Sequence, residues 1–440
     1  MRMYDIIDDK KNGRALSAEQ LAYFVKGVTD GTIPDYQSSA LLMAMFLRGL
    51  DAYETFLLTD CMAQSGDMLD LSAIPGIKVD KHSTGGVGDK TTLIVAPLVA
   101  ACGVPVAKMS GRGLGFTGGT IDKLEAIPGF TTSLSREDFF QTVKKTGCAI
   151  ISQTAGIAQA DKKLYALRDV TATVDSIPLI ASSVMSKKLA SGADAVLLDV
   201  KLGSGAFMKS LEDAIALASL MVRLGERAGK KTAALITNMD IPLGMAIGNA
   251  LEVSEVIDIL QGGGPSDLRE VCTALAANML ELAGKGSYKG CHAQASQALA
   301  DGSALKKFAE MVAAQHGDAG IIKNRGLLGT APCHLDVYAQ KCGFISGMDT
   351  EKIGAVSVLL GAGRKTKEDQ IDRTAGVLLH KKRGDQLLTG DRLATLYSSG
   401  TASLTAAAAQ LTAACRIEKT EPRPEKMILA KITAEKTEIY

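Results

Sequence analysis

The chain lacks any excess of charge of one sign. Its 440 residues include 49 Lys and Arg against 48 Asp and Glu. No global field therefore draws the protein to nucleic acid or to an anionic membrane, and we expect neither as a partner. Any anion must be held by a local arrangement, so loops and helix ends are the places to search. With 46% hydrophobic and 22% charged residues, the chain has ample material for a globular core.

Other common signals are also missing. Eight cysteines are scattered without a CxxC pair or a tight cluster, which favours reduced thiols over a disulfide framework or a zinc site. The most apolar stretch, Leu93–Ala107, is broken by prolines and a glycine and is too short to span a bilayer. The first residues carry acids where a secretory signal needs an apolar run. We therefore expect a cytoplasmic protein without a membrane partner. There is no internal repeat.

The periodicity of apolar residues divides the chain into three zones. The first 65 residues predict a small all-helical unit, with capping boxes at Ser17 and Asp51 and a further cap at Asp35. From about Gly76, short β-branched runs alternate with helical stretches, which predicts an α/β domain with a mainly parallel sheet. Beyond about residue 335, short strands around glycine turns predict an α+β module. The charged last twenty residues suggest a mobile tail.

These zones predict domain boundaries and elements. We expect a helical domain at residues 1–65 with residues 163–193 returning to it, an α/β domain at 66–162 and 194–335, and a C-terminal α+β domain at 336–440. The expected strands are Ile77–Val79, Val104–Ala107, Ala149–Ile151, Ala195–Val200, Ala233–Thr237, Val337–Ile345, Ala375–Leu379 and Arg392–Tyr397. Helices are expected at Leu93–Cys102, Ser135–Thr146 and Ser210–Ala228. Ligands of such folds bind at the carboxyl ends of the strands.

A glycine-rich loop follows the first of these strands and opens a helix. It reads Lys81-His-Ser-Thr-Gly-Gly-Val-Gly-Asp-Lys-Thr-Thr92. Its glycines let the backbone approach a ligand closely, and amides at a helix start point at an anion. Lys81 adds charge, while Ser83 and Thr92 add hydroxyl donors. Lys81 precedes the glycines, so this is no Walker A loop. The alternative is a tight turn without a ligand.

A second glycine-rich loop follows the next strand. Five glycines lie among the ten residues from Ser110, with Thr117 and Thr120 close by. Two such loops on neighbouring strands are hard to explain as turns alone. Together they predict a phosphate site that is enclosed from two sides.

Both loops resemble the signature loops of the thymidine and pyrimidine-nucleoside phosphorylase family. The resemblance continues through Leu164–Lys188 and Gly248–Glu255 and covers essentially the whole chain. It implies a pentosyltransferase in which phosphate attacks C1′ of uridine, deoxyuridine or thymidine. The products would be the free base and (deoxy)ribose 1-phosphate, formed with inversion and without a covalent intermediate. It also implies a homodimer through the helical unit, and a bound potassium ion.

The resemblance assigns roles to single residues. Phosphate would be held by Lys81, Ser83, Thr92, Lys108, Ser110 and Thr120. The pyrimidine would be held by Arg168, Ser183 and Lys187, which with His82 make up the implied catalytic set. Potassium would be bound by the carbonyls of Gly88, Leu243 and Ala246, by the residue at position 90, which is Lys90 here, and by the Glu255 carboxylate.

The chemistry fits these residue types. The pyrimidine leaves with negative charge, which cations such as Arg168 and Lys187 stabilise; a preorganised donor contributes about 2.7–4 kcal/mol. Ser183 can bond the ring edge, and His82, with an ordinary pKa of about 6.5, can protonate the base. Structural alternatives stay open for each. Arg168 can pair with Asp169, Lys187 can lie on a solvated helix face, and His82 can bond the backbone of a turn.

Three positions bear on specificity or depart from the family pattern. Lys108 stands where the strictly 2′-deoxy-specific branch has Met, which favours acceptance of a 2′-hydroxyl. Phe116 replaces the usual His of the second loop. Lys90 replaces a Thr of some relatives, so its ammonium can weaken or replace the potassium ion.

Two rival functions remain. An anthranilate-type phosphoribosyltransferase would need an acidic pair for magnesium pyrophosphate, and Asp89 and Asp122 are the nearby candidates. The base-directed set of Arg168, Ser183 and Lys187 argues against it. A non-enzymatic nucleoside or phosphate binder would keep the loops but would not need those cations. We expect the helical unit to carry the base-directed set and the α/β unit to carry the phosphate loops, with a closing cleft between them.

Overall fold

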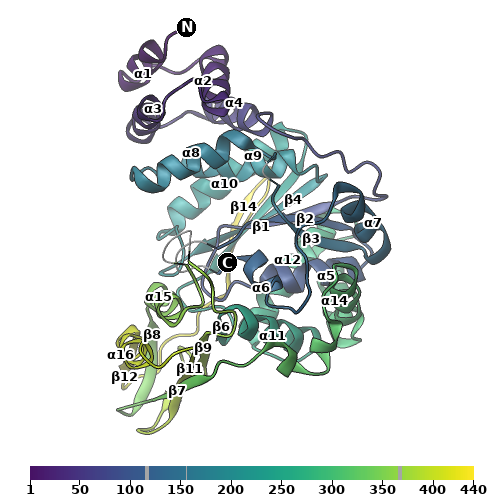
Figure 1. Cartoon of the computed structure of the whole chain (residues 1–440), viewed down its shortest axis with the longest axis vertical. Coiled ribbons are helices and arrows are strands. Elements are labelled where there is room, and N and C mark those ends of the chain that lie inside the picture. Colours follow the sequence, from purple (N-terminus) through teal and green to yellow (C-terminus); the bar gives the residue numbers. More distant parts are fainter. Residues whose placement is uncertain (114–117, 155, 365–368) are drawn as a thin grey trace.

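The computed structural model describes residues 1–113, 118–154, 156–364 and 369–440 (Figure 1). The chain begins with the helices α1 (Met3–Lys11), α2 (Ala18–Asp30), α3 (Asp35–Arg48) and α4 (Ala52–Ala63). The predicted capping boxes at Ser17 and Asp51 are confirmed. The cap predicted at Asp35 is wrong, because Pro34 is the extended N-cap and Asp35 lies in the first helical turn. An acidic side chain in the first turn is stabilised by the positive end of the helix dipole.

Two later helices complete this bundle and join it to the rest of the molecule. They are α8 (Gln159–Val170) and α9 (Ile177–Ala190). Leu164 and Leu179 pack in the same core as Phe24 of α2. Other residues of α9, such as Met185, belong to the core beside the main sheet. One helix is therefore shared by two packing units, and side chains on α9 lie at their junction.

The main sheet has the order β1-β4-β5-β13-β14. Its parallel part consists of β1 (Val79–Ser83), β4 (Ala195–Leu202) and β5 (Lys231–Asn238). A separate parallel pair, β2 (Val106–Ser110) and β3 (Cys148–Ser152), lies beside β1. The prediction of an α/β fold with a mainly parallel sheet is confirmed. β1 extends further than expected and includes the first residues of the glycine-rich loop.

Helices cover the sheet on both sides. α10 (Leu211–Arg227) packs with α9 on one face, and α12 (Ser266–Leu282) packs on β1, β4 and β5 from the other. The remaining helices of this region are α5 (Thr91–Ala101), α6 (Thr120–Leu124), α7 (Arg136–Thr146), α11 (Asn249–Leu260), α13 (Tyr288–Ala300) and α14 (Ser303–Ala314). Two short 3₁₀ turns follow at Ala319–Ile322 and Arg325–Leu328. Apolar side chains on both faces explain why these strands read as continuous hydrophobic runs.

The C-terminal module contains two small antiparallel sheets. One has the order β6-β9-β11-β7 and the other β10-β8-β12. Their strands are β6 (Ala246–Ile247), β7 (Cys333–Tyr338), β8 (Gly343–Met348), β9 (Gly376–Leu379), β10 (Gln386–Leu387), β11 (Arg392–Ser398) and β12 (Cys415–Glu418), and the helices are α15 (Thr350–Leu360) and α16 (Leu404–Ala414). The single strand predicted at Val337–Ile345 is wrong. A turn divides this segment into β7 and β8, which enter different sheets.

The expected mobile tail is instead part of the main sheet. β13 (Ile428–Ile432) pairs antiparallel with β5, and β14 (Thr437–Ile439) pairs with β13. Ala430 and Ile432 are buried against Ile236 of β5. The alternation of apolar and charged residues is the signal of a half-buried strand, and it outweighs the overall charge of the segment. Since β6 and β13 each pair with a sheet of another zone, the domain boundaries stay predictions.

Within the described parts of the chain, every helix is either too short or too polar to cross a membrane.

We predict that Ile432→Ala lowers the free energy of unfolding by about 2–5 kcal/mol, because it leaves a cavity against β5. Urea denaturation of the full chain measures this change. Glu435→Ala, at an exposed position of the same segment, is the control and is expected to change the value by less than about 0.5 kcal/mol. Equal, small effects of both substitutions would show that the segment does not pack on the sheet.

Candidate active site

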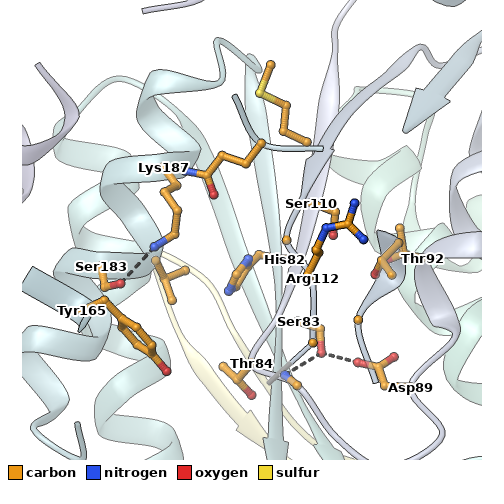
Figure 2. A pocket seen from close by; sticks show the side chains of 18 of the residues that line it. His82, Ser83, Thr84, Asp89, Thr92, Ser110, Arg112, Tyr165, Ser183 and Lys187 are labelled. Carbon is orange, nitrogen blue, oxygen red and sulfur yellow. Dashed lines mark hydrogen bonds between the residues drawn. The ribbon is translucent and has the colours of Figure 1, made fainter. Parts of the chain in front are cut away.

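A cavity of about 640 Å³ opens where β1 and β2 end, between the phosphate loops and the helices α8 and α9. Its volume falls within the range of small-molecule sites. Figure 2 shows two facing walls, with Ser183, Lys187 and Tyr165 on one side and Ser83, Asp89, Thr92 and Ser110 on the other. The predicted site residues that line this cavity are His82, Ser83, Thr92, Lys108, Ser110, Thr120, Ser183 and Lys187. Lys81 and Arg168 do not line it.

The first loop presents hydroxyls and amides to the cavity. Ser83, the last residue of β1, donates its hydroxyl proton to Asp89 and accepts from the Gly85 amide at 3.1 Å. Thr92 lies in the first turn of α5, where helix amides are unpaired and the helix dipole is positive. These groups converge on one region of the cavity (Figure 2). The arrangement suits an oxyanion.

Asp89 is a functional residue that the sequence interpretation used only for a rival function. Its carboxylate accepts from Ser83 and from the Thr91 hydroxyl at 2.6 Å. Burial acts to raise the pKa of this carboxyl, but Lys81, Lys201 and Lys123 hold the pKa well below its usual range. Asp89 therefore stays ionised and orients the hydroxyls of the loop. Its position within the glycine-rich loop was the available signal.

Lys81 lies beneath the loop and is only 2% exposed. Its ammonium donates to the Thr91 hydroxyl at 2.6 Å and pairs with Asp199 at 3.0 Å. Burial acts to lower its pKa, but Asp89 and Asp199 outweigh burial and raise it. Lys81 thus places a fixed charge behind the loop. Its direct contact with phosphate stays a prediction.

Lys108 belongs to the cavity wall and shares a carboxylate with a second lysine. Asp80 lies 3.3 Å from the Lys108 ammonium and 2.6 Å from that of Lys188. Burial lowers the pKa of Lys108 to about 7, since repulsion from Lys188 and Lys81 offsets the attraction of Asp80. The Lys108 side chain is therefore uncharged in a large fraction of the molecules at neutral pH. An anion bound beside it would restore its proton.

The opposite wall is built by α9. Ser183 and Lys187 are one helical turn apart, and the Lys187 ammonium donates to the Ser183 hydroxyl at 3.0 Å. Lys187 also forms an ion pair with Asp161 of α8. This ion pair fixes a cation at the cavity, so the interpretation of Lys187 as part of a solvated helix face is wrong. Tyr165 of α8 lines the same wall and was missed by sequence reasoning.

His82 lies between the two walls (Figure 2). Burial, followed by repulsion from Lys188, Lys108 and other lysines, holds its pKa well below the ordinary value. The ordinary pKa assumed for His82 from the sequence is therefore wrong. A neutral imidazole carries one N–H donor and cannot release a second proton.

Arg168 of α8 binds the segment that connects α8 to α9 and the first turn of α9. Its guanidinium donates to the carbonyls of Thr173, Val174 and Leu179 at 3.1, 2.6 and 3.0 Å. These backbone carbonyls take the place of the ion pair with Asp169 that sequence suggested as an alternative. These three bonds use three of the five N–H donors of the guanidinium, and its contact with a base stays a prediction.

The residues implied as potassium ligands gather around the ammonium of Lys90. Its Nζ lies 3.0 Å from the Leu243 carbonyl, 2.7 Å from the Ala246 carbonyl and 2.5 Å from the Glu255 carboxylate. The backbone amide of Lys90 donates to the Gly88 carbonyl at 2.9 Å. Burial acts to lower the pKa of Lys90, but Glu255 and Glu252 raise it, so the side chain is charged. Phe116, the other departure from the family pattern, lies outside the described residues.

Comparison with known proteins places this site in a class. Residues 4–66 match the helical bundle domain of the glycosyl transferase family, and residues 76–305 match the a/b domain of the same family. Residues 344–418 match the pyrimidine nucleoside phosphorylase C-terminal domain. The fold and the cavity thus define a glycosyl transferase with this C-terminal domain.

Close relatives narrow the class. Over 400 residues the chain is 54% identical to the pyrimidine-nucleoside phosphorylases of Geobacillus stearothermophilus and Bacillus subtilis, which covers 91% of this chain and 92% of each relative. The chain belongs to the pyrimidine-nucleoside phosphorylase family. The anthranilate phosphoribosyltransferase of Thermus thermophilus shares the fold, with a TM-score of 0.59 and 20% identity over 70% of this chain and 98% of that one.

The acidic pair that a phosphoribosyltransferase would need is not free. Asp122 pairs with Arg112 at 3.2 Å and with Arg364 of the C-terminal module at 3.0 Å. Arg112 also binds Glu125 through two contacts of 2.7 Å. A metal at Asp122 would have to displace two arginines, which favours the phosphorylase over this rival.

We predict that Lys108→Met weakens phosphate binding by about tenfold at pH 6, where Lys108 is protonated, because a charge-assisted contact is lost. As the pH rises through the Lys108 pKa of about 7, the wild type loses the same charge. The ratio of the two dissociation constants should therefore approach one at pH 8.5. Titration calorimetry with inorganic phosphate measures it, and the exposed Lys145→Met is the control. A ratio that does not change with pH would contradict this assignment.

Proposed function

We propose that the protein catalyses phosphorolysis of pyrimidine nucleosides, namely uridine, deoxyuridine and thymidine. Inorganic phosphate is the co-substrate, and the products are the free base and (deoxy)ribose 1-phosphate. The observation that carries this proposal is one cavity with an oxyanion wall on the α/β side and the Ser183–Lys187 pair on the facing helix. The names of the relatives support it.

Phosphate is held by the hydroxyls of Ser83, Thr92, Ser110 and Thr120 and by the loop amides. Its oxygen attacks C1′ in line with the departing base, so the new C–O bond forms as the bond from C1′ to the ring nitrogen breaks. The electron pair passes into the pyrimidine ring, where Lys187 and Ser183 stabilise the charge. Closure of the cleft between the helical unit and the α/β unit brings the two substrates together and excludes water.

His82 becomes protonated only after phosphate has bound. Burial and the surrounding lysines hold the pKa of its imidazole well below the ordinary value, so it is neutral. A bound phosphate dianion supplies the opposite charge and raises its pKa, so that it can carry a proton toward the departing base. Phosphate thus serves both as nucleophile and as the counter-charge of the lysine cluster. Arg168 does not line the cavity, so it joins the base only if closure moves its guanidinium toward the base.

Lys108 makes the site tolerant of a 2′-hydroxyl. Its ammonium lies in the cavity wall with Ser110 and contacts Asp80 and the Met109 carbonyl. Met at this position would offer no hydrogen bond to the sugar. We therefore include uridine among the substrates.

We also propose a cytoplasmic homodimer that forms through the helical unit. Large apolar side chains are exposed on its helices, among them Tyr4 at 69%, Tyr36 at 74% and Leu47 at 71%. Exposed groups of this kind mark interaction surfaces. We leave potassium out of the proposed chemistry, because the cage implied for it contains the Lys90 ammonium.

The purified protein should release uracil from uridine only when phosphate is present, with ribose 1-phosphate formed in equal amount. Liquid chromatography of the base and phosphorus NMR of the sugar phosphate measure both products. Arsenate in place of phosphate is expected to release base without a stable sugar ester. Binding of uridine without release of base in phosphate would instead indicate a non-enzymatic binder.

A pair of substitutions tests the two walls. Ser183→Ala should lower kcat/KM for uridine about 10²-fold by removing a donor to the base, and it should leave the KM for phosphate nearly unchanged. Ser83→Ala should mainly raise the KM for phosphate. Steady-state kinetics with each substrate varied separately measure the split. The reverse pattern would overturn the assignment of the walls.

A further inference from the structure

Lys90 and three oxygens form a closed cage behind the phosphate loop. We define the Lys90 cage as Lys90 with the Leu243 and Ala246 carbonyls and the Glu255 carboxylate. Lys90 is fully buried. A lysine ammonium has three N–H donors, and the cage offers one acceptor to each. One positive charge faces one negative charge, so the cage is balanced.

The cage is preformed by its backbone. Glu255 uses its second oxygen to accept from the amides of Met245 and Ala246 at 2.8 and 3.2 Å. Gly244 has φ of +73°, and a side chain there would lie 2.2 Å from the Glu255 carboxylate and 3.0 Å from the Lys90 ammonium. Only glycine lets the chain pass this close. The oxygens are therefore held in place around a single small cationic centre.

The cage joins three parts of the molecule. Lys90 directly follows Asp89, which orients Ser83, and it directly precedes α5. Glu255 belongs to α11, and Ala246 begins β6 of the C-terminal sheet. The position of the phosphate loop relative to the C-terminal module therefore depends on the charge inside the cage.

The residues present do not fit a potassium ion. The centre between the three oxygens is taken by Nζ, and a second cation beside it would meet a like charge without a free carboxylate. If Lys90 were Thr, as in some relatives, the same three oxygens would surround an open position.

We propose that the Lys90 ammonium is a covalently attached substitute for the monovalent cation of this site. The phosphate loop is held in place without potassium, and neither thermal stability nor phosphate affinity depends on that ion. The link to phosphate affinity rests on the proposed function, whereas the link to stability does not.

The first experiment uses the wild-type protein freed of potassium by dialysis. Its Tm and its KM for phosphate are measured in potassium chloride and in tetramethylammonium chloride at equal ionic strength. We expect the same Tm and less than a twofold difference in KM. A saturable rise of Tm with potassium would overturn the proposal, whatever the enzyme's activity.

The second experiment opens the cage with Lys90→Thr. In tetramethylammonium chloride the variant should have a Tm several degrees lower and a KM for phosphate about tenfold higher, because a buried carboxylate has lost its partner. Potassium should restore both values in a saturable manner. A variant that folds only with potassium gives the same result in stronger form. A variant that potassium does not restore, or that folds in neither salt, would overturn the proposal.

The matched control is Lys382→Thr, which removes a neighbouring lysine that is 12% exposed and also paired with a carboxylate. Lys382 donates to the Pro242 carbonyl at 2.6 Å and to Asp267 at 2.5 Å, and Asp267 also accepts from the Gly244 amide at 3.1 Å. We expect a lower Tm that potassium does not restore, since no oxygen cage surrounds this ammonium. Equal restoration of both variants would show a general salt effect and would overturn the proposal. If the wild type responds to potassium while uracil release is normal, this inference fails and the proposed function stands.

Discussion

Buried lysines paired with buried carboxylates behind the phosphate loops determine the geometry of the whole cavity. Asp80 holds Lys108 and Lys188, Asp199 lies between Lys81 and Lys201, and Glu255 holds Lys90. An unpaired charge at such depth would cost several kcal/mol, so each carboxylate both permits a cation and fixes its position. The strands and helix ends place these cations around one cavity. A chain with almost no net charge can thereby present a local positive field.

At the cavity wall the pairing is not one to one, because two lysines share one carboxylate, Asp80. Burial lowers the pKa of Lys108 to about 7, because repulsion from Lys188, which shares Asp80, offsets the attraction of that carboxylate. His82 stays neutral under burial and the repulsion of several lysines. In the proposed function, a bound phosphate supplies further negative charge, which couples binding of the nucleophile to protonation of His82. The base wall on α9 is organised separately, through Asp161 and Ser183.

Sequence predicted the parts of the site that depend on local pattern. Glycine loops after strands placed Ser83, Thr92 and Ser110 at one cavity, because the carboxyl ends of neighbouring parallel strands meet at one edge of a sheet. Residue spacing does not determine which oxygen atoms a long side chain contacts, so the carbonyl partners of Arg168 were missed. For the same reason the sequence left open whether the Lys90 ammonium weakens or replaces a potassium ion. The prediction of a mobile C-terminal tail was wrong for a related reason. Charged residues alternate there with apolar ones, and the apolar side chains are buried only when the segment pairs with β5.

In the proposed function, the cavity holds titratable groups that take up protons when an anion binds. Titration of inorganic phosphate into the wild-type protein at pH 8, in buffers that differ in ionisation enthalpy, measures this directly. Phosphate is then dianionic and has few protons to release. The account predicts net proton uptake by Lys108 and His82 on binding. Binding without proton exchange, or with net release, would contradict it.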